Sequence, residues 1–319
     1  IPSSYQYLGN NGAAAYPLIY APNAKPGWDA GFRAFDLYRY KLEESKFYKT
    51  NKPFSQLSYQ LASGKEQVIK ALHTQNPRPN FGFGFDYRLI SAPGFFVTQN
   101  TNHKSYRIFS NYQGKRKRYA AFFIMLGNTI KNSENGGIVA DSSLHDPNLK
   151  KRFSVPVNLG NASPYEPNPF QSSISTGNTY KDFTIFIRQT YDIGKKDSIA
   201  INDSTTEYLF YPKLRAQHSF TYSTYSYQYK DEMADSTIYK NWYDTMVKFG
   251  KDSFFVQDKW SVMSNDFTLL QFPDTKNSGQ FISAGAKLEN IKGELKTGTR
   301  NFYNFVIHGE YRNKTRNKL

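Results

Sequence analysis

The chain has 319 residues, a formal net charge of +15 and no cysteine, so disulfide frameworks, thiolate zinc sites and cysteine nucleophiles are excluded. Its hydrophobic share of 39% lies below the roughly 45–50% of ordinary globular chains, yet 17% of its residues are aromatic, which argues against disorder. The longest apolar stretch, residues 120–127, is much shorter than the ~20 residues of a membrane helix. A polar chain with this many rings is expected to alternate the two kinds of residue, as β-strands do.

Residues 1–53 form the first region of the chain. They are rich in glycine, alanine, proline and asparagine and show no sustained period. We therefore expect a loop-rich N-terminal entry segment, with one strand near residues 35–40. Regular alternation begins after residue 53, and we assign residues 54–319 to the strands of a single β-domain.

The clearest strand is the segment NFGFGFDYRLIS, which begins at Asn80. Its rings share one face, whereas its glycines, Asp86 and Arg88 share the other. Further strands are predicted at residues 57–61, 105–113, 119–128, 183–193, 219–229, 254–262, 281–290 and 303–311. Two of these are irregular: residues 119–128 are apolar on both faces, which leaves a buried helical turn open, and the phase changes near Ser223, which predicts a β-bulge. A short helical pattern at residues 238–250 falls in a loop.

Short and long connections alternate along the β-domain. Short polar turns follow His73 and Gln113, whereas long loops occupy residues near 131–182 and 230–253. Successive connections of an up-and-down sheet lie at opposite ends, so one end is expected to carry tight turns and the other large loops, as in outer-membrane barrels. The link at residues 194–217 is long where a short turn is expected.

Two classes of protein fit these strands. One is a soluble secreted β-sandwich that binds glycans through exposed tyrosine and tryptophan. The other is a transmembrane β-barrel, which accounts better for aromatic strand faces, for strands of about 9–11 residues and for a mean hydropathy of −0.67 in a ring-rich chain. The predicted fold class is therefore all-β: an antiparallel up-and-down barrel of outer-membrane type.

A family resemblance supports the barrel. The segments FYKTNKPFSQLSYQLASGKEQ, ALHTQNPRPNFGFGFDYRLISAPGFF, QNTNHKSYRIFSNYQGKRKRYAA and NSENGGI resemble the Bacteroidota putative porin family of outer-membrane β-barrels. The likeness covers most of the chain and is weakest in the loops at residues 131–181 and 230–267. Members resemble longer barrels that continue past the EYRNKTRN turn, so we expect this chain to be the N-terminal portion of one, cut before barrel closure.

The predicted barrel fold suggests roles for particular side chains. None is catalytic, and we expect no enzyme activity, cofactor or metal, since the five histidines lack zinc-site spacing. The charged residues of the polar strand faces are candidates for lining the lumen: Asp86, Arg88, Arg188, Asp192 and Arg312. An interior salt-bridge network that conducts nothing is the equal alternative. The rings of the opposite faces are candidates for facing lipid: Phe81, Phe83, Phe85, Tyr87, Tyr303 and Phe305.

The run Lys115, Arg116, Lys117 and Arg118 is the strongest charge feature. Nucleic-acid binding needs a groove or helix that presents such charges, whereas this run lies in a predicted tight turn. We expect a periplasmic turn facing anionic lipid, worth ~1 kcal/mol per basic residue, and no nucleic-acid partner. The expected partners are outer-membrane lipid, small solutes and other outer-membrane or periplasmic proteins.

The expected function is a porin-like barrel in the bacterial outer membrane that lets small solutes pass passively. The first alternative is a non-conducting scaffold barrel within an outer-membrane complex, and the second is the soluble glycan-binding sandwich. The sequence leaves the solute and the total number of strands open.

Overall fold

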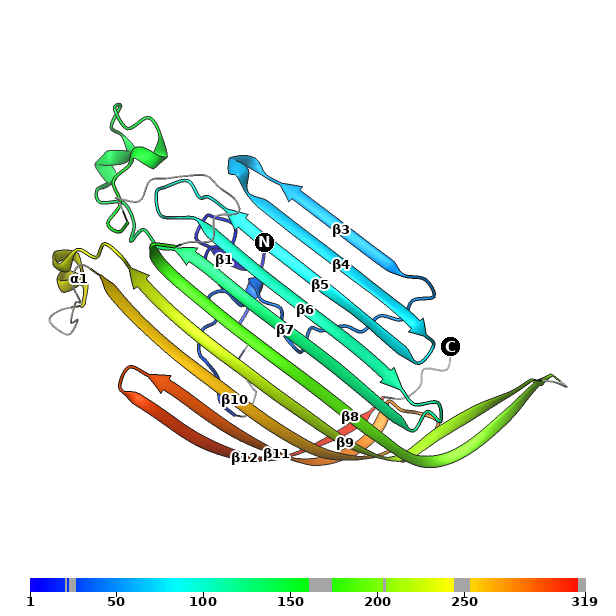
Figure 1. Ribbon diagram of the computed structural model, residues 1–319. Helices are drawn as coiled ribbons and strands as arrows, with labels where there is room; N and C mark the ends of the chain where they lie inside the picture. Colours follow the sequence, from blue (N-terminus) through cyan, green and yellow to red (C-terminus); the bar gives the residue numbers. More distant parts are fainter. Residues whose placement is uncertain (21, 23–26, 161–173, 203–204, 244–252, 315–319) are drawn as a thin grey trace.

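The computed structural model describes residues 1–20, 22, 27–160, 174–202, 205–243 and 253–314. One antiparallel sheet of ten strands, in chain order from β3 to β12, dominates the fold (Figure 1). Its strands are β3 (Phe54–Leu61), β4 (Gln67–Arg78), β5 (Phe81–Ala92), β6 (Thr101–Gln113), β7 (Tyr119–Ser133), β8 (Thr176–Asn202), β9 (Thr205–Asp231), β10 (Phe254–Gln271), β11 (Gln280–Leu295) and β12 (Gly298–Asn313). The predicted all-β, up-and-down order is confirmed; the sheet is open, with β3 and β12 as its edges.

The two ends of the sheet differ as predicted in where the long loops lie, although short links join β3 to β4 and β11 to β12 at that same end. Tight turns join β4 to β5 and β6 to β7 at one end, whereas the loops after β7 and β9 lie at the other (Figure 1). We call these the turn end and the loop end. The loop end carries short helices: η3 (Asp141–Leu144), η4 (Arg152–Ser154) and α1 (Ser236–Tyr243). None of the helices in the described parts of the chain is long and apolar enough to cross a membrane.

Residues 194–202 and 205–217 are strand rather than a connection. β8 and β9 are 27 residues long each, and they stay paired past register shifts at Ile193/Gly194 and Ala200/Asn202. The result is a two-stranded arm that extends beyond its neighbours at the turn end (Figure 1). The sequence alternates weakly here because an isolated ribbon has no second layer to bury one of its faces.

Each strand places alternate residues on opposite faces of the sheet, and the printed register aligns these residues into rows across the strands. We define the covered face by the row that runs through Asp86, Arg107, Leu126, Thr184 and Ser223. We define the open face by the adjacent row that runs through Phe85, Ile108, Met125, Ile185 and Tyr222.

Residues 1–53 pack on the covered face, which gives that face its name. They contain a small hairpin, β1 (Tyr5–Tyr7) and β2 (Ala15–Pro17), and a 3₁₀ turn, η1 (Asp36–Tyr38). The N-terminal segment, dark blue in Figure 1, runs behind the sheet in that view. The strand expected near residues 35–40 is wrong: this stretch turns back on itself so that its side chains reach the sheet.

The apolar cores lie between this segment and the sheet. Phe35 and Tyr38 join Ile90, Ile130 and Tyr180 in one buried cluster. In a second cluster, residues of the segment pack on the strands: Leu42, Phe47 and Tyr48 against Phe109, Ile124, Leu126 and Phe186. The covered face is therefore an interior, although many of its residues are polar.

These cores explain the two irregular strands. Residues 119–128 are apolar on both sides because Ile124 and Leu126 meet the N-terminal segment, so they form β7 and no helical turn. The phase change near Ser223 is not a bulge, since β9 pairs through it without a register shift. The aromatic residues instead change face: Tyr222 lies on the open face, whereas Tyr227 stacks on Phe32 of the segment at 4.2 Å between ring centroids.

Candidate functional site

All five predicted lumen-lining residues lie on the covered face: Asp86, Arg88, Arg188, Asp192 and Arg312. They do not form one group. Asp86 and Arg88 are on β5 beneath the N-terminal segment, Arg188 and Asp192 are on β8 toward the turn end, and Arg312 is on the edge strand β12. The sequence thus predicted their face, while their neighbours depend on the N-terminal segment.

A charged network that the sequence analysis missed holds the segment to the sheet. Arg39 donates to Asp36 at 2.6 Å and to Asp182 at 2.8 Å. Asn128 donates to Asp182 at 2.7 Å and exchanges two hydrogen bonds with the backbone of Tyr40. Because the Asp182 side chain is only 2% exposed, its charge depends on these partners.

Tyr40 lies at the centre of a second group of charges. Its hydroxyl donates to Asp86 at 2.8 Å, and Arg107 donates to the other oxygen of that carboxylate at 2.7 Å. The guanidinium carbons of Arg88 and Arg107 stand 4.7 and 5.0 Å from the centroid of the Tyr40 ring, within cation–π range. Arg88 also donates to the carbonyl of Tyr38. Burial, together with the Asp86 carboxylate, raises the pKa of Tyr40.

The first turn of the segment is fixed near the loop end. Asn10 donates to the carbonyl of Gln99 at 2.7 Å, and Thr101 donates to the carbonyl of Asn11 at 2.6 Å. The buried ring of His103 meets the carbonyl of Gly12 at 2.6 Å. Gly12 has a φ of +87°, and a Cβ there would lie 2.7 Å from the Thr101 hydroxyl. Only glycine combines this backbone with such a close approach.

Paired charges continue toward the turn end. Arg215 binds Asp192 through two nitrogens at 2.7 and 2.8 Å. Arg188 donates to Ser219 at 3.2 Å. Arg312 binds Glu310 of its own strand at 2.7 Å and is about half exposed. The side chains of Arg215 and Arg312 are more exposed than that of Arg107, which lies under residues 38–45.

A polar cavity separates the segment from strands β8–β11. Its volume is about 500 Å³. Charged side chains from the segment and from the sheet line it: Asp29, Arg33, Asp36, Arg39, Lys41, Glu43, Asp182, Lys287 and Glu289. The cavity could hold a small polar molecule, because groups of both signs converge on it. Among the described residues, no group of three or more His, Cys, Asp or Glu side chains could hold a metal ion.

The open face carries every predicted lipid-facing ring: Phe81, Phe83, Phe85, Tyr87, Tyr303 and Phe305. Its rows near the middle of the sheet are almost wholly apolar, for example the row through Ile108, Met125, Ile185 and Tyr222. Many of these side chains are exposed, up to 78% for Tyr303. A contiguous apolar surface of this extent marks contact with a membrane or a protein.

A family model described as Putative porin matches residues 2–319. The chain belongs to the Putative porin family. The resemblance to the putative porin family is thereby confirmed. The matched residues include the loops at residues 131–181 and 230–267, where the resemblance was weakest. No curated protein and no solved structure matches the chain. The function of this porin-family chain is therefore inferred from its geometry.

The basic run of this porin-family chain lies where it was predicted, in the turn between β6 and β7. Lys115, Arg116 and Lys117 are exposed, and Lys117 takes a left-handed φ of +55° that closes the turn. Arg118 turns inward, 5.5 Å from the ring of Phe210 on the arm. The sequence could have indicated the Arg39 and Asp182 network only by pairing a charge of the entry segment with a polar-face carboxylate, and no local pattern links them.

Proposed function

We propose that the protein is an outer-membrane β-barrel of porin type, without enzymatic activity, that lets small polar solutes pass between residues 1–53 and the covered face. The division of the sheet into an exposed apolar face and a covered polar face supports this proposal most. In a soluble protein, the apolar face would be the buried one.

The height of the apolar band supports membrane insertion. The band reaches from the row of Tyr106 and Phe183 to the row of Ile193 and Leu214. On β8, the ten residue steps from Phe183 to Ile193 at roughly 3.3 Å each span about 33 Å. Strands of outer-membrane barrels tilt by ~40°, which reduces this length to about 25 Å, the height of their apolar band. Tyrosines border the turn end of the band, including Tyr112, Tyr119 and Tyr191, as in an aromatic girdle.

The orientation follows from the connections. Outer-membrane barrels keep short turns on the periplasmic side and long loops outside. We therefore place the basic turn, Lys115–Arg118, at the periplasmic surface and the loops after β7 and β9 outside. In the closed barrel the covered face becomes the lumen wall and residues 1–53 become an internal constriction.

Membrane insertion is tested by washing membranes with carbonate and extracting them with detergent. We expect the complete protein in the detergent fraction, and recovery in the soluble fraction would exclude the barrel. Among the described residues, the ten-stranded sheet is covered by the N-terminal segment with its two-stranded hairpin and not by the large second sheet that a glycan-binding sandwich requires.

Conduction is tested in planar bilayers. We expect small, cation- or anion-biased currents from the complete protein, and larger currents when residues 1–53 are deleted or when Arg39→Ala loosens them. Arg188→Glu should shift the reversal potential, because Arg188 faces the lumen without a carboxylate in its own hydrogen bonds. A folded barrel that stays silent in every variant would exclude conduction.

The second candidate is a non-conducting scaffold barrel. One observation favours it: the charges beneath residues 38–45 are paired with one another and with the segment, so they fill the wall rather than face a channel. Unaltered silence after deletion of residues 1–53 would support this scaffold role over the pore.

A further inference from the structure

We propose that a row of lysines on the open face, near the loop end, binds the phosphate groups of anionic lipids in the outer leaflet. The inference deepens the proposed function, because it rests on insertion of the sheet in a membrane. It assigns a lipid site to residues for which the sequence patterns predicted no role.

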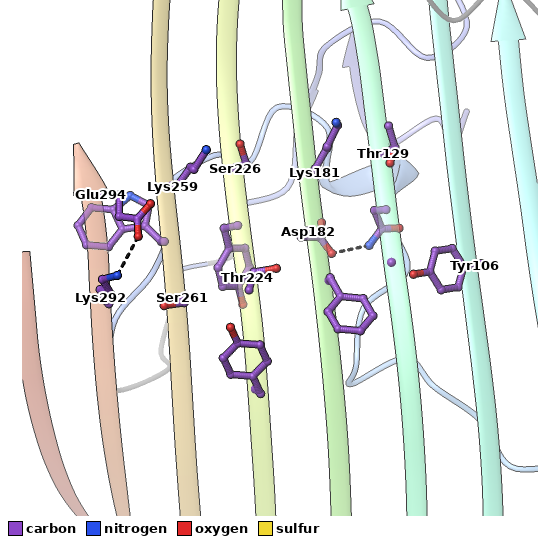
Figure 2. A pocket seen from close by; sticks show the side chains of 16 residues that line it. Tyr106, Thr129, Lys181, Asp182, Thr224, Ser226, Lys259, Ser261, Lys292 and Glu294 are labelled. Carbon is purple, nitrogen blue, oxygen red and sulfur yellow. Dashed lines mark hydrogen bonds and ion pairs between the residues drawn. The ribbon is translucent and has the colours of Figure 1, made fainter. Parts of the chain in front are cut away.

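The lysine row crosses five neighbouring strands. Lys104 on β6 pairs with Thr129 on β7, and Thr129 pairs with Lys181 on β8. Lys181 pairs with Ser226 on β9, and Ser226 pairs with Lys259 on β10. Lysine and hydroxyl side chains thus alternate, and strands ≈ 4.8 Å apart separate successive lysines by roughly 10 Å. Figure 2 shows Thr129, Lys181, Ser226 and Lys259 side by side on these strands.

These three lysines are available for an external anion. Lys104, Lys181 and Lys259 are exposed, and none of them forms an ion pair with a described residue. Their neighbour Lys292 is instead held by Glu294 at 2.9 Å. Lys131 on β7 lies further toward the loop end of the open face and adds positive charge, whereas Lys230 on β9 is paired with Glu232 at 2.6 Å.

The row stands at the border of the apolar band. One row toward the middle of the sheet, Tyr106 pairs with Gly127, and Gly127 pairs with Phe183. Gly127 leaves room for the Tyr106 ring, which would lie 2.6 Å from a Cβ at that position. A shallow hollow of about 740 Å³ lies over this border and includes Lys181, Tyr222 and Lys259 in its wall. The hollow presents apolar surface to acyl chains and ammonium groups to the head groups above them.

Phosphate is the group that fits this arrangement best. Ammonium groups and hydroxyls all donate hydrogen bonds to phosphate oxygens, and an anionic lipid surface attracts nearby lysines by ~1 kcal/mol each. A solute in the lumen cannot reach these side chains, because they point to the opposite face of the sheet from residues 1–53. A lipid molecule can reach them with its chains on the apolar band.

The test uses the complete protein, purified in a zwitterionic detergent and titrated with phosphatidylglycerol while bound lipid is counted by native mass spectrometry. Phosphatidylcholine and inorganic phosphate are the comparison ligands. The variant carries Lys104→Gln, Lys181→Gln and Lys259→Gln. The matched control carries Lys150→Gln, Lys151→Gln and Lys240→Gln, which remove the same charge from exposed positions in the loops.

We expect phosphatidylglycerol to bind the native protein and the control alike, and to bind the row variant about 100-fold more weakly. Phosphatidylcholine and inorganic phosphate should bind far more weakly to all three proteins. Equal phosphatidylglycerol affinity in the row variant and the control would overturn the lipid site. The barrel would still stand in that case if both variants remain in the detergent fraction after carbonate washing, so the two proposals fail separately.

Discussion

The two faces of the sheet reverse the usual relation between polarity and burial. The covered face holds Arg107, Asn128 and Asp182 beneath the chain's own first 53 residues, whereas the open face exposes Phe267, Leu288 and Ile307. Burial of charge is tolerated on one side because Arg107 meets the carboxylate of Asp86 and Asp182 meets Arg39. The apolar surface exposed on the other side marks contact with a membrane or with another protein. The proposed insertion of the open face in a membrane rests on this difference.

The largest effect on the covered face is expected from a substitution of Arg39. We expect Arg39→Ala to lower the free energy of unfolding by about 3–5 kcal/mol, because it leaves the buried carboxylate of Asp182 without its cation. Urea unfolding of the detergent-solubilised protein measures this loss, and protease cleavage within residues 1–53 reports detachment of the segment.

A double variant sharpens this result. Adding Asp182→Asn to Arg39→Ala removes the unpaired charge, so the combined loss should be smaller than the sum of the two single losses. Strict additivity would mean that the pair contributes nothing specific to the attachment of the segment.

The open face is tested by a charge at two depths. Ile185→Arg places a cation in the middle of the apolar band and is expected to cost about 2–4 kcal/mol in a membrane, whereas Ile193→Arg at its border should cost about 0–1 kcal/mol. Both residues lie on the open face of β8, so they form a matched pair. Reconstitution in vesicles and urea unfolding give the two values. Equal costs at both depths would argue against a membrane on this face.

The sequence predicted the open face well because alternation is a local property. In residues 81–89 and 303–311 the rings all fall on alternate positions, and the structure keeps all of them on one side. The alternation of turns and loops likewise follows from strand order alone. The arm of β8 and β9 was visible in the sequence only as a link that was longer than the short turn expected between these two strands.

The covered face was predicted less well because its partner is distant in the chain. Arg39 and Asp182 are separated by 143 positions, and a segment without a period gives no sign of where it packs. The local signals were the two irregular strands, which carry apolar residues on the otherwise polar face. Two of these residues, Ile124 and Tyr227, contact residues 1–53 in the structure.

The loop-end attachment of the segment is tested at Gly12. Alanine there meets the Thr101 hydroxyl and the His103 ring at a φ of +87°, and we expect a loss of about 2–3 kcal/mol in the stability of the segment. Gly9→Ala is the matched control, because Gly9 has a φ of +78° but open space around its Cβ position. That variant should cost only about 1 kcal/mol of backbone strain. Hydrogen exchange of residues 1–20 compares the two, and identical exchange rates would exclude the close approach to His103.

The smallest expected effect appears only at high pH. Burial of Tyr38 between the segment and the sheet raises its pKa to about 12, whereas an unfolded tyrosine ionises near 10. Between these values the unfolded chain releases the proton while the folded protein keeps it, so stability falls as the pH rises through this range. At pH 11 the loss is about 1.4 kcal/mol.

Tyr38→Phe isolates this contribution, because phenylalanine keeps the ring in the buried cluster and removes the ionisable hydroxyl. The difference in unfolding free energy between the native protein and this variant should change between pH 10 and pH 12 and stay constant below pH 9. A constant difference for Tyr38→Phe across the whole range would mean that residues 1–53 already leave the covered face before the hydroxyl ionises, and the two faces would then be equally open to water.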